Sequence, residues 1–226
     1  GGRSLLAATT RGLAVVSTDR DDGTCRIFTS FGHSRRKESV SLSISPDLEP
    51  QQGHWSNYPA TAIRRLARNF GIDRGADIAL ECDLPESSGM STSSAVICYM
   101  WLVLARRNGI PETDVFKRNL GTPEALCTYL GFIENGQDCG PELVGDKGVG
   151  TFGGSEDHTA IMSCTPGSVA LYSYCPTKHE GTFDFPKDWA FVIAVSGALA
   201  EKTGGAMADY NNAAFLARDA AAAWCR

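Results

Sequence analysis

The longest apolar run of the chain extends from Ala95 to Ala105 and is hydrophobic on every side. The residues that follow, Arg106-Arg107-Asn108-Gly109, supply cations and a left-handed stop, both of which suit the end of a helix. A helix that is apolar all round lies inside a core rather than on a surface. We therefore expect a buried helix over residues 95–105.

Three further segments have a helical pattern. The segment from Tyr58 to Phe70 carries its apolar residues on one face and is followed by a glycine. A second helix is expected to begin at Thr122, with Pro123 in its first turn. The alanine-rich segment from about residue 207 to residue 225 predicts a third.

Strand-like segments lie between and around these helices. They are Leu13–Thr18, Cys25–Ser30, Ser39–Ile44, Ile78–Asp83, Ser168–Cys175 and Trp189–Val195. Asp22-Gly23, between the first two, suits a hairpin turn, so those two strands are expected to pair. Strands and helices in this order indicate an α+β fold rather than a regular βαβ alternation.

The net charge of the chain makes some classes of binding partner unfavourable. The 226 residues include 26 acidic and 21 basic side chains, for a net charge of −5, and the only basic cluster is Arg35-Arg36-Lys37. Nucleic acid and anionic membranes are therefore poor partners. The longest apolar run is too short to cross a bilayer, and the sequence does not begin with a secretory signal pattern, so we expect a cytoplasmic protein.

The cysteines show no spacing that is typical of a metal site or a disulfide framework. There are eight of them, none in a Cys-x-x-Cys pair, and several lie in apolar segments. We expect free thiols, most of them buried.

A loop rich in hydroxyl groups, residues 85–94, connects a predicted strand to the buried helix. The first N–H groups of a helix have no partner within it, and together with the hydroxyls of Ser91, Thr92 and Ser93 they can surround an anion. Hydroxyls can also bind Mg²⁺ beside a phosphate. The simpler alternative is that Thr92 or Ser93 only caps the helix. Gly89 and the run of four hydroxyl residues favour a phosphate-binding loop.

A second glycine-rich segment, residues 148–159, carries Asp157. The glycine pair before it lets the backbone approach a ligand, so this carboxylate could orient or deprotonate a substrate hydroxyl. The alternative is a turn aspartate that bonds to its own backbone. A formal G-x-G-x-x-G match has no strand before it and is interpreted as accidental. A hydrolase triad with Ser93 and His158 is disfavoured, because the chain has no G-x-S-x-G elbow.

These loops resemble those of the GHMP family of small-molecule kinases, and of galactokinases in particular. The hydroxyl-rich loop is similar to the family's Pro-x-x-x-Gly-Leu-x-Ser-Ser-Ala signature, and Gly153–His158 resembles the Gly-Gly-Met-Asp-Gln segment that holds the catalytic aspartate. Three more segments match in the same order along the chain. They are Trp55-Ser56-Asn57-Tyr58, Glu134-Asn135 and Asp209-Tyr210-Asn211. The resemblance covers essentially the whole chain.

The resemblance implies the fold of a GHMP-kinase N-terminal domain, which is ribosomal protein S5 domain 2-like and has a mixed sheet with helices packed on it. It also implies phosphorylation of the anomeric hydroxyl of galactose or a similar sugar, with ATP and Mg²⁺ as cofactors. Asp157 would be the catalytic residue, and Gly154, Asp157 and Tyr210 would contact the sugar. The implied ATP contacts are Trp55, Tyr58, Gly89, Ser91, Thr92 and Ser93. The implied metal ligands are Thr92, Ser93 and Glu134.

Alternatives remain open within this resemblance. A kinase of the same fold could act on arabinose, a uronic acid or mevalonate, and a non-catalytic sugar-sensing module could descend from such a kinase. Trp55 and Tyr58 could simply pack against the helix that follows them. The chain also departs from the family pattern. Ser87 and Ser94 stand where galactokinases usually have glycine and alanine, and His158 stands where glutamine is expected.

Parts of the family pattern have no counterpart in the sequence, namely the first motif with its arginine, the sugar clamp and the C-terminal domain. We therefore expect residues 1–226 to be an incomplete GHMP-kinase N-terminal domain plus the start of the C-terminal part, weakly active or inactive in isolation. The segment from Gln137 to Lys147 lengthens the distance along the chain between Glu134 and Asp157, and it could reshape the sugar pocket.

Overall fold

The larger of two sheets contains four strands in the order β2 (Leu13–Arg20), β5 (Gly75–Cys82), β3 (Thr24–Phe31) and β4 (Arg36–Ser43). The computed structural model of the protein describes residues 2–31, 36–51, 53–84, 89–192 and 207–224. β5 is antiparallel to β2 and parallel to β3, whereas β3 and β4 are antiparallel. The sheet is therefore mixed, and the predicted α+β class is confirmed.

The hairpin predicted from Asp22-Gly23 is wrong. Gly23 does turn the chain with a φ of 62°, but β5 lies between β2 and β3, so these two strands do not pair with each other. β5 takes the central place because Ala76, Ile78 and Leu80 all point into the core. A strand with such an apolar face gains most where both of its edges are paired.

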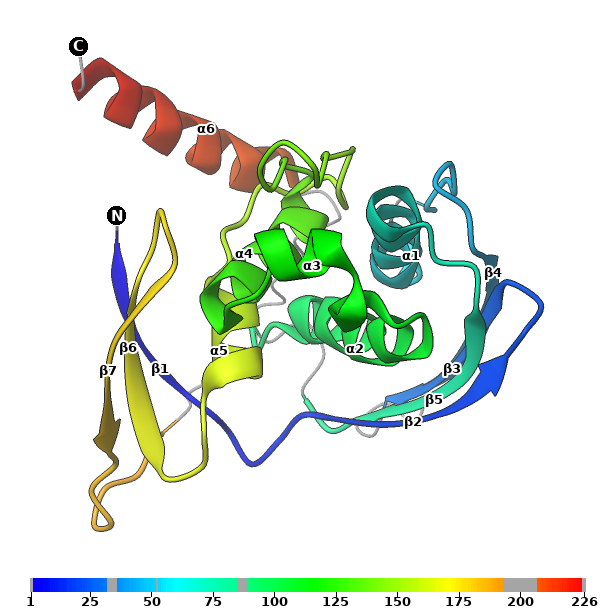
Figure 1. The fold of residues 1–226 in the computed structure, drawn as a ribbon. Coiled ribbons are helices and arrows are strands. Elements are labelled where there is room, and N and C mark those ends of the chain that lie inside the picture. The colour runs from blue at the N-terminus through cyan, green and yellow to red at the C-terminus, as the bar shows by residue number, and fades with distance from the viewer. Residues whose placement is uncertain (1, 32–35, 52, 85–88, 193–206, 225–226) are drawn as a thin grey trace.

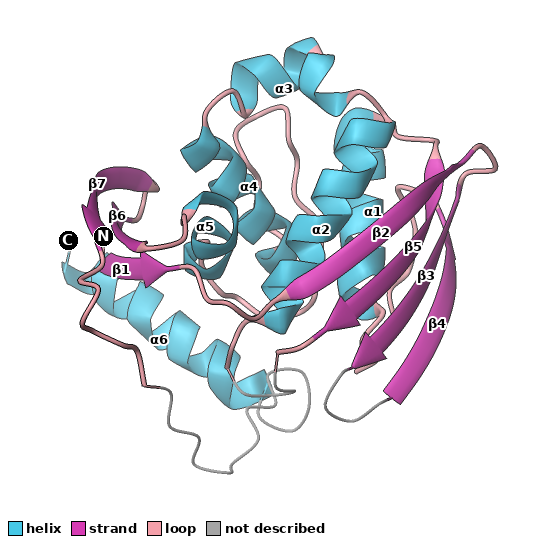
Figure 2. Cartoon of the chain, turned by 90° about the horizontal axis from the view of Figure 1, so that it is seen from below, coloured by secondary structure: helices cyan, strands magenta, loops and turns pink. Residues whose placement is uncertain are grey.

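Helices cover one face of this sheet (Figure 2). In chain order they are α1 (Asn57–Phe70), α2 (Thr92–Arg107), η1 (Ile110–Glu112), α3 (Asp114–Asn119), α4 (Pro123–Asn135) and α5 (Glu156–Ser163). The three helices predicted in this region are confirmed as α1, α2 and α4. α2 contacts α1, α4 and α5 as well as the sheet, which places it at the centre of the core. Its apolar run is buried apart from a few positions such as Leu102.

A smaller sheet lies on the other side of the helices (Figure 1), so that the helices are held between two sheets. It consists of β1 (Arg3–Ala7), β6 (Ser168–Ser173) and β7 (Lys178–Asp184), all antiparallel. The strand predicted at Ser168–Cys175 is confirmed as β6. The strand predicted at Trp189–Val195 is wrong over residues 189–192, which are irregular, and its remainder lies outside the described residues. β7 was not expected, because its sequence is largely polar and both of its faces are mostly exposed.

The alanine-rich segment forms α6 (Met207–Trp224), which confirms the prediction as far as Trp224. Its first turn lies near the loop before α5, and the rest extends away from the body of the molecule (Figure 1). Of the other predictions, Pro85–Ser88 of the hydroxyl-rich loop, Arg35 of the basic cluster and Cys225 lie outside the described residues.

The seven described cysteines are free thiols, and four of them are buried: Cys25, Cys82, Cys98 and Cys127. This confirms the expectation for the described part of the chain. Within that part, no helix combines the length and the apolar character that a membrane span requires.

Gly131 sets the distance between α4 and the start of α5. A Cβ atom at this position would lie 2.8 Å from the Cα atom of Ser155. A Gly→Ala change inside a helix ordinarily stabilises a protein by about 1 kcal/mol. Here we expect Gly131→Ala to lower the free energy of unfolding by about 1–3 kcal/mol, because the backbone of Ser155 must move.

Urea unfolding measures this effect, and Gly12→Ala is the control because no atom lies within 4 Å of the Cβ atom that it adds. An unfolding midpoint for Gly131→Ala at or above that of the unmodified protein would contradict the expectation.

Candidate functional site

The start of α2 has the geometry of an anion-binding loop. Gly89 has a φ of 75°, and Ser91, which precedes the helix, has the left-handed values φ 55° and ψ 38°. The side chain of Ser91 makes no capping hydrogen bond. The first amides of α2 therefore point out of the helix without a side-chain cap from Ser91, and they are suited to a ligand with negative charge.

A cavity of about 1210 Å³ brings this loop together with Asp157. It lies between α2, α5 and the connection from β1 to β2. Gly89 and Ser91 line the cavity from the loop before α2, and Asp157 lines it from the first turn of α5. Two segments that are far apart in the sequence thus border one cavity.

The glycine-rich segment before Asp157 is packed against the end of α4. Gly148 has a φ of 57°, and a Cβ atom there would collide with the carbonyl of Glu134. Asn135 Nδ2 donates to the carbonyl of Gly153 at 2.8 Å. Gly148 is thus required by close packing against α4, in agreement with the interpretation of the G-x-G-x-x-G match as accidental.

A second group of candidate residues gathers around Tyr58. Its hydroxyl makes a hydrogen bond with Ser93, and Glu134 and Tyr210 are close enough to influence its ionisation. Burial, together with the charges of Glu134 and Tyr210, raises the pKa of Tyr58 to about 12, although the bond with Ser93 acts in the opposite direction. Four of the residues named by the sequence therefore lie together, contributed by α1, α2, α4 and α6.

Glu134 has two polar neighbours that the sequence did not assign to the site. Ser94 Oγ donates to Glu134 Oε2 at 2.9 Å. His158 Nε2 lies 3.1 Å from the same oxygen, within ion-pair distance, although it is not aligned for a hydrogen bond. His158 therefore faces Glu134, while Ser93 bonds to Tyr58, and the disfavoured hydrolase triad is not assembled.

Cys98 connects the two groups of residues. It lines the cavity beside Asp157, and it lies on the turn of α2 that follows Ser94. Burial raises the pKa of its thiol strongly, and the charges of Cys127, Glu134 and Asp157 add to the effect. Cys98 is thus near both carboxylates and remains a protonated thiol at neutral pH.

Tyr210 reaches the site because the first turn of α6 docks on the loop before α5. A Cβ atom at Gly153 would lie 3.1 Å from the Tyr210 hydroxyl. Asn211 Nδ2 donates to the carbonyl of Gly150 at 2.8 Å, and its Oδ1 accepts from the amide of Phe152 at 3.2 Å.

Three candidate residues make none of the contacts described above for the cavity and for the group around Tyr58. Trp55 lies just before α1, with its ring 5.8 Å from that of His54, and it packs partly against the main core. Thr92 is the first residue of α2, and Gly154 is an exposed loop residue. The alternative in which Trp55 packs the start of α1 agrees with its position.

The donors at this site suit Mg²⁺ held with a phosphate better than a metal held by protein alone. Within the described ranges, no group of three or more His, Cys, Asp and Glu side chains could hold a metal ion. Mg²⁺ usually takes only one or two carboxylates and fills the rest of its shell with water and substrate phosphates. Glu134, with the hydroxyls at the start of α2, fits that requirement.

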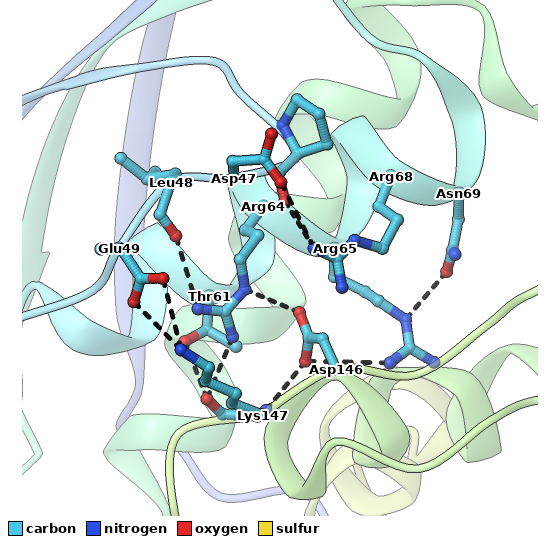
Figure 3. A network of polar contacts seen from close by, with 12 residues as sticks. Asp47, Leu48, Glu49, Thr61, Arg64, Arg65, Arg68, Asn69, Asp146 and Lys147 are labelled. Atoms are coloured by element: carbon cyan, nitrogen blue, oxygen red, sulfur yellow. Dashed lines mark hydrogen bonds and ion pairs between the residues drawn. The ribbon is translucent and has the colours of Figure 1, made fainter.

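The segment from Gln137 to Lys147 packs on α1 instead of bordering the cavity (Figure 3). Arg64 Nε donates to Asp146 Oδ2 at 2.7 Å, and Arg65 Nη1 lies 3.9 Å from Oδ1. Arg65 Nη2 also donates to the carbonyl of Gln137 at 2.6 Å. The side chains of Arg65 and Asp146 are at most 2% exposed, so this segment is tied to α1 by a buried ionic network.

Comparison with known proteins agrees with this architecture. Residues 57–140, which extend from α1 to just beyond α4, match the family model described as GHMP kinases N terminal domain. This part of the chain is therefore similar to the N-terminal domain of GHMP kinases.

The curated relatives that the chain resembles are galactokinases. The chain is 24% identical to the galactokinase of Bacillus subtilis over 166 residues, which cover 73% of this chain and 39% of that protein. It is 31% identical to the galactokinase of Exiguobacterium sibiricum over 98 residues, which cover 42% of this chain and 24% of that protein. The chain thus spans less than half of the length of these curated relatives.

The fold is also similar to that of a solved structure, the Lactococcus lactis galactokinase complexed with galactose. The TM-score is 0.57 at 20% sequence identity, and the match covers 80% of this chain and 41% of the other. At this level of identity the likeness concerns the fold alone.

Proposed function

We propose that the protein is an ATP-dependent sugar kinase that phosphorylates the anomeric hydroxyl of galactose or a similar sugar. The observation that carries the proposal is the cavity that Gly89 and Ser91 share with Asp157. Phosphoryl transfer needs a phosphate-binding loop and a group that orients the attacking hydroxyl, both facing one space. The relatives named galactokinase direct the choice of substrate toward galactose.

In this proposal the start of α2 holds the phosphates of ATP. Gly89, Ser91, Thr92 and Ser93 supply backbone amides and hydroxyls, and Trp55 and Tyr58 border the adenine. Thr92, Ser93 and Glu134 would hold Mg²⁺, which when bound neutralises charge on the transferred phosphoryl group. Ser93 also bonds to Tyr58, so the phosphate side and the adenine side of the nucleotide site are linked by one contact.

On the substrate side, Asp157 accepts the hydrogen bond of the attacking hydroxyl and orients it, or removes its proton as transfer proceeds. Gly154 leaves space beside it for a sugar ring, and Tyr210 closes the same side. Asp157 lies in the first turn of α5, which holds its side chain at the edge of the cavity.

Substrate profiling of the full-length protein tests the proposal. Formation of ADP is measured with ATP, Mg²⁺ and either galactose, arabinose, a uronic acid or mevalonate. We expect the largest kcat/KM with galactose, and the product to be the sugar 1-phosphate by ³¹P NMR. A larger kcat/KM with another substrate would reassign the specificity within the family. Binding of sugar and ATP without turnover would indicate a sugar-sensing module and overturn the proposal.

A further inference from the structure

The carboxylate of Glu134 is held where three helices meet. Glu134 comes from the last turn of α4, Ser94 from the first turn of α2, and His158 from α5. Both neighbours approach the same oxygen, Oε2, at 2.9 Å from Ser94 Oγ and 3.1 Å from His158 Nε2. A carboxylate approached in this way from two sides has little freedom to rotate.

All three residues are shielded from water. His158 is 1% exposed, Ser94 is 2% exposed and Glu134 is 9% exposed. A buried carboxylate without polar neighbours would be destabilised, and a buried hydroxyl or imidazole away from polar groups would be as well. Ser94 donates a hydrogen bond to the carboxylate, and the imidazole of His158 lies within ion-pair distance of it without forming a hydrogen bond, so the environment of Glu134 depends on both neighbours.

We propose that Ser94 and His158 are positioning residues that hold the Glu134 carboxylate in the orientation needed to bind the nucleotide-associated divalent cation. The inference rests on the proposed function, in which Glu134 is a ligand of that cation. Groups that hydrogen-bond or orient a metal ligand commonly change metal affinity by about 10- to 100-fold when they are removed. Neither residue needs to touch the nucleotide or the sugar for this role.

The substitutions separate positioning from folding. Ser94→Ala removes the hydroxyl donor while raising the helix propensity of α2, so a loss of cation binding would not follow from a weaker helix. His158→Leu removes the imidazole N–H, whereas His158→Gln keeps an N–H donor. Thr159→Val is the matched control, because Thr159 is also a buried hydroxyl residue of α5, but its hydroxyl bonds to the carbonyl of Ser155.

The test is the affinity of Mn²⁺ for the full-length protein with saturating ADP, measured by electron paramagnetic resonance, with thermal unfolding recorded for every variant. We expect Ser94→Ala and His158→Leu each to weaken Mn²⁺ binding by about 10-fold or more. His158→Gln should restore most of the affinity, and Thr159→Val should leave it unchanged. If His158→Leu does not fold, the comparison of Ser94→Ala with Thr159→Val decides.

Glu134→Gln distinguishes the failure of this inference from the failure of the proposed function. If Glu134→Gln weakens Mn²⁺ binding but Ser94→Ala and His158→Leu do not, the positioning role is overturned and the metal role of Glu134 stands. If Glu134→Gln also has no effect, Glu134 is not a ligand of the cation and both are overturned.

Discussion

Asp157→Asn in the full-length protein is expected to lower kcat for sugar phosphorylation by about 100- to 10,000-fold, because asparagine cannot accept the proton of the attacking hydroxyl. Nucleotide affinity should stay unchanged, since the start of α2 and the Tyr58 group are not altered. The measurements are ADP release at saturating substrates and ATP binding by calorimetry.

Glu156→Gln is the matched control for this substitution. Glu156 is the preceding residue in the same first turn of α5, and it is exposed, whereas Asp157 is partly buried and lines the cavity. Both substitutions remove one negative charge from the same helix end, so only the position of the carboxylate differs. Equal activity of the two variants would remove Asp157 from its proposed role.

Asp146→Asn is expected to lower the free energy of unfolding by about 3–5 kcal/mol, because it leaves the buried guanidinium groups of Arg64 and Arg65 without their carboxylate. Asparagine has nearly the same shape as aspartate, so the loss comes from charge rather than from a cavity. Urea unfolding followed by circular dichroism measures the change.

The pair of Glu49 and Lys147 provides the control for a surface charge. Glu49 Oε1 lies 3.3 Å from Lys147 Nζ, and both side chains are at least 75% exposed. Glu49→Gln should therefore change the free energy of unfolding by less than about 1 kcal/mol. If Asp146→Asn were as mild as Glu49→Gln, the buried network would not be what fixes the segment from Gln137 to Lys147.

The helices could be predicted well from the sequence because their signals are local. Thr122 with Pro123 in the next position begins α4, and its hydroxyl accepts from the amide of Ala125 as an N-cap should. Gly71 ends α1 with a φ of 63°. In each case the residue that decides the boundary adjoins the helix, so no knowledge of the tertiary fold is needed.

The strand order could not be predicted in the same way. Asp22-Gly23 carries the local signal of a hairpin, yet the partner that β2 and β3 share is made of residues 75–82. A turn motif reports how the chain bends and does not report whether another strand enters between the two arms. β7 escaped prediction for a related reason, since a polar edge strand has no apolar alternation to detect.

In the candidate site, too, residues with local sequence signals could be predicted, and contacts between distant residues could not. Asp157, Ser91 and Glu134 could be proposed as candidates because they lie in loops or helix ends with recognisable sequence patterns. The pairing of Glu134 with Ser94 and His158 could not be, because those residues are 40 and 24 positions away in the sequence and meet only when three helices pack. The single local sign was that Ser94 and His158 are two of the three positions, with Ser87, where the sequence analysis found a departure from the family pattern.

The central place of β5 has a consequence for the order in which the molecule can form. β2 and β3 leave the ribosome before β5, and they become neighbours of a common strand only after Cys82 has been synthesised. Until then β3 has no neighbouring strand on the side that β5 later occupies. The side chains of Cys25 and Ile27 on β3 are fully buried in the folded protein. Completion of this sheet therefore depends on a contact between distant parts of the chain, and such contacts are the slow ones in folding.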